Sequence, residues 1–355
     1  MNGNNPDDSI EYLNALNKRL KESYPTDCRN AVIRRQYGMS QLCINTRGCS
    51  AGMTGSCLYC NYPHGHNVDL IGASSAVKNL LDSMEPSDKS LLVGSSGSIL
   101  DPSEIPDDIL NAILEELSAL KEKNIIFETR IDIMPLTVLD RIAEHLKGNK
   151  ITIEFGLESS NPLVLRYCLN KKLNLPKIAE TMRTIRSKGF GVTANVLVGT
   201  PFLAPQEQIR DSIDSIKWAI ENGADDVVLF PVNIRHGTVL KELCDIGAYR
   251  PTEYDAIVSV LKWIDCKYLD RISLSWSDPE EVDDPVIHTH PRVNNAGVFR
   301  FFREFMSEQS LKGRSTLLSD YVRNINVLKP TQTVNYEKAI SLMCSMSTKL
   351  MGKNR

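Results

Sequence analysis

Short apolar runs alternate with longer amphipathic segments along most of this chain of 355 residues. The short runs have the length and the β-branched content of buried strands. Six of them stand out, at 38–46, 89–96, 124–132, 150–158, 191–199 and 225–233. The segments between them repeat apolar residues at helical spacing, as in Ile109, Ile113, Leu117 and Leu120. Strands that alternate with helices predict an α/β protein with a parallel sheet.

The number of strand and helix units is too small for a closed barrel. Six units occupy about 230 residues, whereas a closed eightfold barrel takes roughly 250 residues and two more units. We therefore expect a partial (β/α)6 barrel that resembles part of a TIM barrel. The run ISLSW at 272–276 is a candidate for one more strand.

Three regions follow from this pattern. Residues 1–37 form a polar helical lead-in, residues 38–278 form the partial barrel, and residues 279–355 form a C-terminal extension. We expect the extension to cover the mouth of the barrel and to end in a helical tail. In FRFFRE, at 299–304, arginine alternates with phenylalanine; the expected arrangement is a tail helix with Phe299, Phe302 and Met306 turned inward.

Composition narrows the class of protein. The chain is 42% hydrophobic and 24% charged, with a formal charge of -3 and a pI near 6.1. These values indicate a globular protein without a global basic field for nucleic acid or membrane. No apolar run approaches the roughly 18 residues of a membrane span, and no signal peptide is apparent, so we expect a cytoplasmic protein without a membrane partner. The odd number of cysteines, nine, argues against a disulfide framework.

A cluster of three cysteines carries the clearest chemical signal. Cys49, Cys57 and Cys60 have the spacing C-x7-C-x2-C, with an aromatic residue before the last. A structural zinc site normally has four protein ligands, and His64 or His66 could be the fourth. A 4Fe-4S cluster on only three thiolates would leave one iron open to a substrate or cofactor. The loop follows the first expected barrel strand, so it would lie at the mouth of the barrel, where barrel enzymes place their chemistry.

These cysteines and later segments together resemble the radical S-adenosylmethionine (SAM) superfamily. The usual spacing in that superfamily is C-x3-C-x2-C, and the longer spacing is similar to the subgroup of the Elongator catalytic subunit and the radical partner of archaeosine synthase. The resemblance covers residues 38 to about 278. Its later segments are GSSGSILDPSEIP (94–106), FETRID (127–132), IEFGLESSNPLVL (153–165), VLVGTPFLAPQEQI (196–209) and FPVNIRHGTVLKELCDIGAYRP (230–251).

The resemblance implies a cofactor site made by particular residues. Cys49, Cys57 and Cys60 would hold a 4Fe-4S cluster, whose open iron would bind the methionine part of S-adenosyl-L-methionine. The strand end that faces the methionine amine would consist of Gly94, Ser95, Ser96 and Gly97. The turn at Val198 and Gly199 would pack on the adenine.

Charged residues at the expected strand ends extend this site. Arg130 is placed to pair with the methionine carboxylate as a bidentate donor. Glu158 is placed to accept the ribose hydroxyls, and Glu154, four positions earlier, has the parity to point into the same interior.

The activity implied is reductive cleavage of SAM, with an external electron donor such as flavodoxin or ferredoxin, followed by radical modification of a substrate. The archaeosine-type enzyme acts on a lysine-bearing deazaguanine base in tRNA. That family has a basic segment containing Gly and Cys after its last barrel strand, whereas this chain has the acidic segment SDPEEVDDP at 277–285. The difference favours a small-molecule substrate, such as a natural product. The alternatives are a tRNA-modifying lyase and a non-catalytic zinc or iron-sulfur protein.

We expect the substrate to contact residues 279–305, where the resemblance ends. The candidates for substrate binding in that segment are His288, His290 and Arg292.

Overall fold

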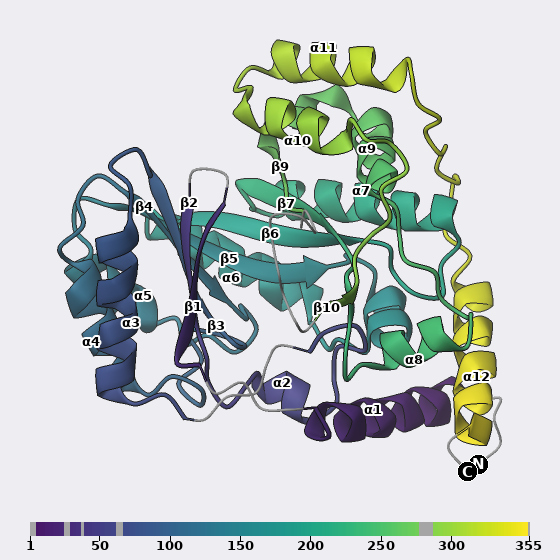
Figure 1. The fold of residues 1–355 in the computed structure, drawn as a ribbon, viewed down its shortest axis with the longest axis horizontal. Coiled ribbons are helices and arrows are strands. Elements are labelled where there is room, and N and C mark those ends of the chain that lie inside the picture. The colour runs from purple at the N-terminus through teal and green to yellow at the C-terminus, as the bar shows by residue number, and fades with distance from the viewer. Residues whose placement is uncertain (1–4, 25–28, 37–38, 62–66, 277–286, 354–355) are drawn as a thin grey trace.

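A single curled sheet of eight strands forms the centre of the protein (Figure 1). The computed structural model describes residues 5–24, 29–36, 39–61, 67–276 and 287–353. The strand order is β1-β2-β3-β4-β5-β6-β7-β9, in which β1 is antiparallel to β2 and every other pairing is parallel. The sheet forms a half-barrel, so the expected partial barrel is confirmed.

The strands of this sheet match the apolar runs of the sequence. Their bounds are β1 Ala31–Gln36, β2 Met39–Ile44, β3 Ser90–Ser95, β4 Asn124–Thr129, β5 Lys150–Glu158, β6 Gly191–Val198, β7 Asp226–Pro231 and β9 Ile272–Leu274. All six expected strands are present, and the run at 272–276 supplies β9. A separate two-stranded sheet pairs β8 (Ile234–Arg235) with β10 (Ile287–Thr289).

The helices cover the outer face of the sheet and extend beyond its ends. The helices of the barrel region are α2 Ser50–Met53, α3 Leu70–Ser83, α4 Asp107–Leu117, α5 Val138–His145, η1 Val164–Leu169, α6 Leu175–Ser187, α7 Pro205–Glu221, α8 Val239–Asp245, α9 Tyr254–Trp263 and η2 Cys266–Arg271. The flanking helices are α1 Pro6–Glu22, α10 Val298–Ser307, α11 Leu311–Val322 and α12 Tyr336–Lys353. Among these helices, none combines the length and the apolar character needed to span a bilayer.

Alternation along the strands separates the apolar core from a polar interior. In β4, Ile125 and Phe127 are fully buried, whereas Glu128 faces a cavity inside the half-barrel. In β5, Phe155 is fully buried and Glu154 faces the cavity. The main core therefore lies between the sheet and its helices, and the concave face of the sheet remains free for chemistry.

Strand β1 lies inside the region expected to be a helical lead-in, so it was not predicted. Its sequence, AVIRRQ, carries two arginines and forms one edge of the sheet. Polar side chains are common on edge strands because they discourage pairing with other chains, so an edge strand lacks a continuous apolar run.

The C-terminal part contains an aromatic cluster and a terminal helix. Phe302 is fully buried and lies 5.3 Å from Trp276, while Phe301 stacks on Tyr321 at 4.3 Å, both measured between ring centroids. The phenylalanines of FRFFRE therefore pack in or against the core, whereas its charged residues are exposed. Helix α12 lies against α1, at the opposite end of the chain (Figure 1).

Candidate functional site

One large cavity occupies the inside of the half-barrel. Its volume is about 1370 Å³, which exceeds the roughly 300–1,000 Å³ of a pocket for a single small ligand. The cavity reaches from the three cysteines at the carboxyl ends of the strands to Asn124 and Lys150 at their amino ends. It has room for a cofactor and a second molecule side by side.

The cysteine loop forms one wall of this cavity. Cys49 is the residue before α2, and Cys57 has a left-handed backbone with φ 59°. All three thiols are free of disulfides and line the cavity, while Leu58 between them is fully buried. The loop therefore presents its thiols to the cavity and anchors itself through Leu58.

Backbone hydrogen bonds from two distant segments hold the end of this loop. The amide of Cys57 donates to the carbonyl of Asn170 at 3.1 Å, and the amide of Leu58 donates to Leu169 at 3.0 Å. In turn, the amide of Leu240 in α8 donates to the carbonyl of Leu58 at 3.0 Å. Side chains of α1 provide a third support. Asn17 donates to the carbonyl of Gly55 at 2.9 Å, and Lys21 donates to that of Ser56 at 2.7 Å.

The loop after β3 meets the cysteine loop at Gly97. A Cβ atom at Gly97 would lie 2.4 Å from Cys49 Cα and 2.6 Å from its Cβ, so only glycine allows the two backbones to approach this closely. Gly94 faces Glu128 across the barrel interior, where an added Cβ would lie 3.2 Å from Glu128 Oε2. Gly97 lines the cavity, and Gly94 leaves space beside it.

Ser95 and Ser96 turn away from the cavity and stabilise the same loop. Ser95 donates to Glu104 Oε1 at 2.6 Å, and Ser96 accepts a hydrogen bond from the amide of Thr46 at 3.2 Å. Glu104 also accepts hydrogen bonds from the Thr46 hydroxyl and the Ser98 amide. Sequence reasoning missed Glu104, because its role depends on three donors that only the fold brings together.

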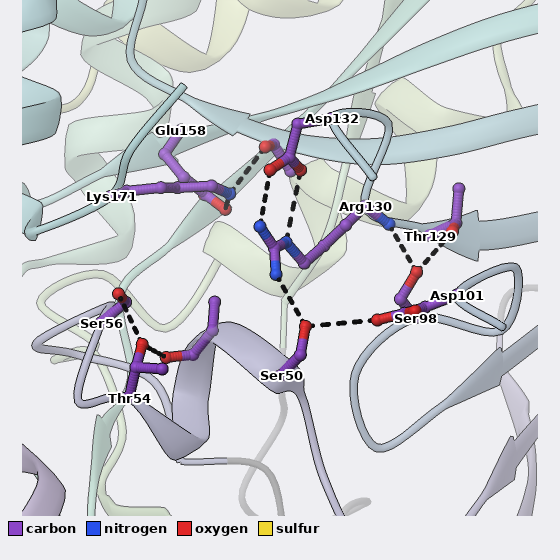
Figure 2. A network of polar contacts seen from close by, with 12 residues as sticks. Ser50, Thr54, Ser56, Ser98, Asp101, Thr129, Arg130, Asp132, Glu158 and Lys171 are labelled. Atoms are coloured by element: carbon purple, nitrogen blue, oxygen red, sulfur yellow. Dashed lines mark hydrogen bonds and ion pairs between the residues drawn. The ribbon is translucent and has the colours of Figure 1, made fainter. Parts of the chain in front are cut away.

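Arg130 lies between β4 and the cysteine loop (Figure 2). Its guanidinium donates to both carboxylate oxygens of Asp132, with the shorter bond at 2.5 Å, and to the Ser50 hydroxyl at 3.1 Å. Ser50 follows Cys49 directly and also contacts Asp101 at 3.2 Å. Asp132 and Ser50 thus hold the guanidinium of Arg130 at the cysteine end of the cavity.

Glu158 lies on the other side of Arg130 and has a left-handed backbone, with φ 67°. Its Oε1 accepts a hydrogen bond from Lys171 at 2.9 Å, and Lys171 also donates to the Gly156 carbonyl at 2.7 Å. The other oxygen, Oε2, is buried and has no hydrogen-bond partner in the described part of the chain. Glu158 therefore offers a free acceptor to a ligand. Sequence reasoning missed Lys171.

A polar layer crosses the middle of the cavity. Asn195 donates to Glu154 Oε1 at 3.0 Å, and Glu128 is the neighbour of Glu154 across the parallel strands. Burial raises the pKa of Glu128 to about 7, and the charges of Glu154 and Glu158 add to this shift. Strand parity identified Glu154; the same parity, applied to the neighbouring strands, would have found Glu128 and Asn195.

Val198 and Gly199 are near the site but do not line the cavity as the structure describes it. Gly199 has φ 103°, and a Cβ there would lie 2.9 Å from Thr252 Cβ, so the turn requires glycine. Tyr249 donates to the Gly199 carbonyl at 2.7 Å. Their contact with adenine stays a prediction.

The C-terminal candidates lie apart from the cavity. His288 packs edge-on against His236 with ring centroids 4.8 Å apart, and Arg292 forms an ion pair with Glu253. His290 is half-buried, and none of the three candidates lines the cavity; Trp276 and Met306 line it at this end. The acidic segment at 277–286 lies outside the described residues. The role of the three candidates in substrate binding stays a prediction.

The donor set fits an iron-sulfur cluster with one open corner. All three cysteines line one cavity, and the backbone at Gly97 packs directly against the first of them. Burial raises the pKa of Cys57 to about 12, and Lys171 and Lys21 act against this shift, so a metal would displace protons when it binds. Within the described ranges, no three Cys, His, Asp or Glu side chains are grouped to hold a single metal ion. His64 and His66 lie outside those ranges.

Comparison with known proteins identifies the family. The model of the Radical SAM superfamily matches residues 44–219. An uncharacterized protein of Methanocaldococcus jannaschii is 26% identical over 276 residues, which are 72% of this chain and 75% of that protein. Archaeosine synthase subunit beta of Methanosarcina acetivorans is 25% identical over 242 residues, 67% of this chain and 69% of its own. The solved structure of Elp3 from Methanocaldococcus infernus has a TM-score of 0.49 and 15% identity, and the match covers 68% of this chain and 59% of Elp3. The chain belongs to the radical SAM superfamily and is a radical SAM enzyme, whose cofactors are a 4Fe-4S cluster and S-adenosyl-L-methionine.

Proposed function

We propose that this enzyme holds its cluster on Cys49, Cys57 and Cys60 and modifies a small molecule enclosed in the half-barrel. The observation that carries the proposal is that the three cysteines, Gly97 and Arg130 all line the same cavity. When bound, the cluster and SAM supply reductive cleavage of the cofactor and a radical that removes a hydrogen atom from the substrate. An external donor such as flavodoxin or ferredoxin provides the electron.

Different residues at the cysteine end of the cavity bind different parts of SAM. The guanidinium of Arg130, which donates to the hydroxyl of Ser50 beside Cys49, pairs with the methionine carboxylate. Gly97 lets the loop after β3 pack against Cys49, which brings that loop beside the methionine part. The Oε2 of Glu158 accepts a ribose hydroxyl, and Lys171 orients that carboxylate through its ion pair with Oε1 at 2.9 Å.

The substrate binds at the polar layer in the middle of the cavity. Glu128, Glu154 and Asn195 lie on neighbouring strands below the level of Arg130 and Glu158. A carboxyl group whose pKa is about 7 can hold or release a proton near neutral pH, so Glu128 is suited to exchange one with a substrate. Enclosure by the sheet would also keep water and other quenching groups away from the radical.

A second candidate is the archaeosine-type reaction on a tRNA base. It is favoured by the similarity to archaeosine synthase subunit beta over two thirds of the chain. A tRNA substrate would need cationic contacts to phosphates, and its affinity would fall steeply as salt increases.

The test begins with protein reconstituted under anaerobic conditions. We expect about four irons and four sulfides per chain and visible charge-transfer absorption. With dithionite and SAM, the enzyme should release 5'-deoxyadenosine. One zinc per chain, or methylthioadenosine as the product, would contradict the proposal. Binding of bulk tRNA, measured at two salt concentrations, separates the two substrates: tight and salt-sensitive binding would support the archaeosine-type reaction.

A further inference from the structure

Lys21 in α1 is a buried lysine for which the cofactor chemistry described above has no use. Its residue is only 3% exposed, and its ammonium group donates to the Ser56 carbonyl at 2.7 Å. No ion pair between described residues includes Lys21. A buried ammonium group without a carboxylate is costly, so its position calls for a compensating negative charge.

The Lys21 ammonium is surrounded by the cysteine loop, so the compensating negative charge would lie on that loop. Ser56, its hydrogen-bond partner, directly precedes Cys57. A Cβ atom at Gly52, in the short helix after Cys49, would lie 3.7 Å from Lys21 Nζ. The ammonium therefore lies inside the cysteine loop, between the helix that follows Cys49 and the segment that leads into Cys57.

The position of this charge matters for the cysteines on either side of it. Lys21 Nζ bonds to the residue before Cys57 and lies beside the short helix that follows Cys49. A buried positive charge at this place favours a negatively charged group on those cysteines.

Neighbouring side chains of α1 fix the same segment of the loop. Asn17 is fully buried; its Nδ2 donates to the carbonyls of Gly55, Ser56 and Cys57 at 2.9, 3.3 and 3.2 Å, and its Oδ1 accepts from the Val239 amide at 2.9 Å. Asn14 donates to the Thr54 carbonyl at 2.8 Å. The carbonyls of Thr54, Gly55 and Ser56 belong to the segment between Cys49 and Cys57, which makes the first cysteine spacing longer than usual. Helix α1 therefore supports the lengthened loop through side-chain hydrogen bonds.

We propose that Lys21 is a positioning residue for the cluster: it fixes the segment before Cys57 and supplies the positive charge that offsets the thiolates and the cluster they hold. The inference rests on the proposed function, in which these cysteines are the ligands. Net charge and hydrogen bonds near the sulfurs set the reduction potential of iron-sulfur clusters. A cation held in the protein interior stabilises the more negative, reduced state more strongly than a solvated one would.

The experiment compares Lys21→Gln with Lys18→Gln. Lys18 is on the same helix and its side chain is 51% exposed, so this control removes the same charge from the surface. Iron content, thermal melting of the cluster-free protein, and the cluster potential are measured, the last by redox titration monitored by EPR without SAM. We expect Lys21→Gln to keep its melting temperature and to disfavour one-electron reduction at least tenfold, which corresponds to about 59 mV. Lys18→Gln should leave the potential unchanged.

Each outcome of the Lys21→Gln experiment either supports or overturns the positioning role. Loss of iron from Lys21→Gln with unchanged melting would also support a positioning role. Equal potentials in the two variants, or a large loss of melting temperature in Lys21→Gln, would overturn the proposal, because Lys21 would then be neutral toward the cluster or needed only for folding. The wild-type iron content tests the ligands separately: if the wild type binds no cluster, it is the proposed function that fails.

Discussion

Two walls of the same cavity are held in different ways. The cysteine wall is fixed by directional hydrogen bonds from α1, from the residues after η1 and from α8. The opposite wall, around Trp276 and Met306, is held mainly by aromatic packing on Phe302 and its neighbours. Directional bonds set atomic positions, whereas apolar packing sets volume and tolerates exchange of similar side chains. We therefore expect atomic position to matter most at the cysteine wall and shape to matter most at the wall around Trp276 and Met306.

The largest expected effect is on the cysteine wall itself. Replacement of Cys49, Cys57 or Cys60 by alanine should abolish the cluster, since each removes one of three thiolate ligands. Cys244→Ala is the control, because Cys244 is in α8 and does not line the cavity. Iron and sulfide per chain and visible absorption report the result. Equal loss in all four variants would mean that cysteine replacement impairs folding.

Arg130→Ala should weaken SAM binding by about 10- to 100-fold, because a hydrogen bond to a charged group contributes roughly 1.5–3 kcal/mol. Its iron content should equal that of the wild type, which separates cofactor binding from cluster ligation. The matched control is Arg183→Ala, an exposed arginine in α6. Calorimetric titration of SAM into reconstituted protein measures the affinity, and an unchanged affinity would refute the role assigned to Arg130.

Replacement of one buried residue in each wall tests the comparison directly. Asn17→Leu leaves several buried backbone groups without partners, so we expect a loss of about 2–4 kcal/mol in the free energy of unfolding together with loss of iron. Phe302→Leu should cost about 1–3 kcal/mol and keep the cluster. Denaturant unfolding and iron analysis give both quantities. If Phe302→Leu also lost its iron, the two walls would not be independent.

Asp211, behind the cofactor end, should give a pH dependence of stability. It accepts a hydrogen bond from Ser159 at 2.8 Å, and burial raises its pKa to about 7. Because the folded pKa is above the unfolded one, the stability contribution is complete below about pH 4 and is lost as the pH rises toward 7. Asp211→Asn should remove this dependence and raise the melting temperature at pH 8. The contribution is at most about 4 kcal/mol, at roughly 1.4 kcal/mol for each unit of pKa. The melting temperatures of wild type and Asp211→Asn are compared at pH 5 and pH 8. An equal change of melting temperature in both proteins between the two pH values would contradict the prediction.

The smallest expected effect concerns the C-terminal histidines. His288 and His290 do not line the cavity that the structure describes, so their joint replacement by alanine should change SAM cleavage in the presence of dithionite by less than twofold. Trp276→Ala, which removes a side chain of the cavity wall, should change it more. A larger effect from the histidines than from Trp276 would support the substrate contact that the sequence predicts for them.

Most strands could be predicted, and the cysteine ligands proposed, because each inference depends on residues that are neighbours in the chain. Apolar runs located β2 to β7 and β9, and the spacing of three cysteines indicated the cluster. Strand ends and parity indicated Arg130, Glu154 and Glu158. These are local signals, and the fold leaves them unchanged.

The supports of the site could not be predicted in the same way. Lys21 and Asn17 are ordinary helix residues until α1 is placed beside the cysteine loop, and Lys171 becomes part of the site only through its bond to Glu158. Glu104 needs donors from two different strand ends. Single-sequence patterns carry no information on such long-range pairs.

The hydrogen bonds on the cysteine loop have a consequence for the order of assembly. Asn17 accepts a bond from an amide 222 positions later in the chain, and Leu58 accepts one from Leu240. The loop cannot reach its final shape until α8 has been synthesised and docked. Contacts of such long sequence separation form late and slowly in folding. With the ligands proposed above, the cluster would be loaded only after α8 has docked, because a chain that stalls earlier would offer three thiols in an unfinished loop.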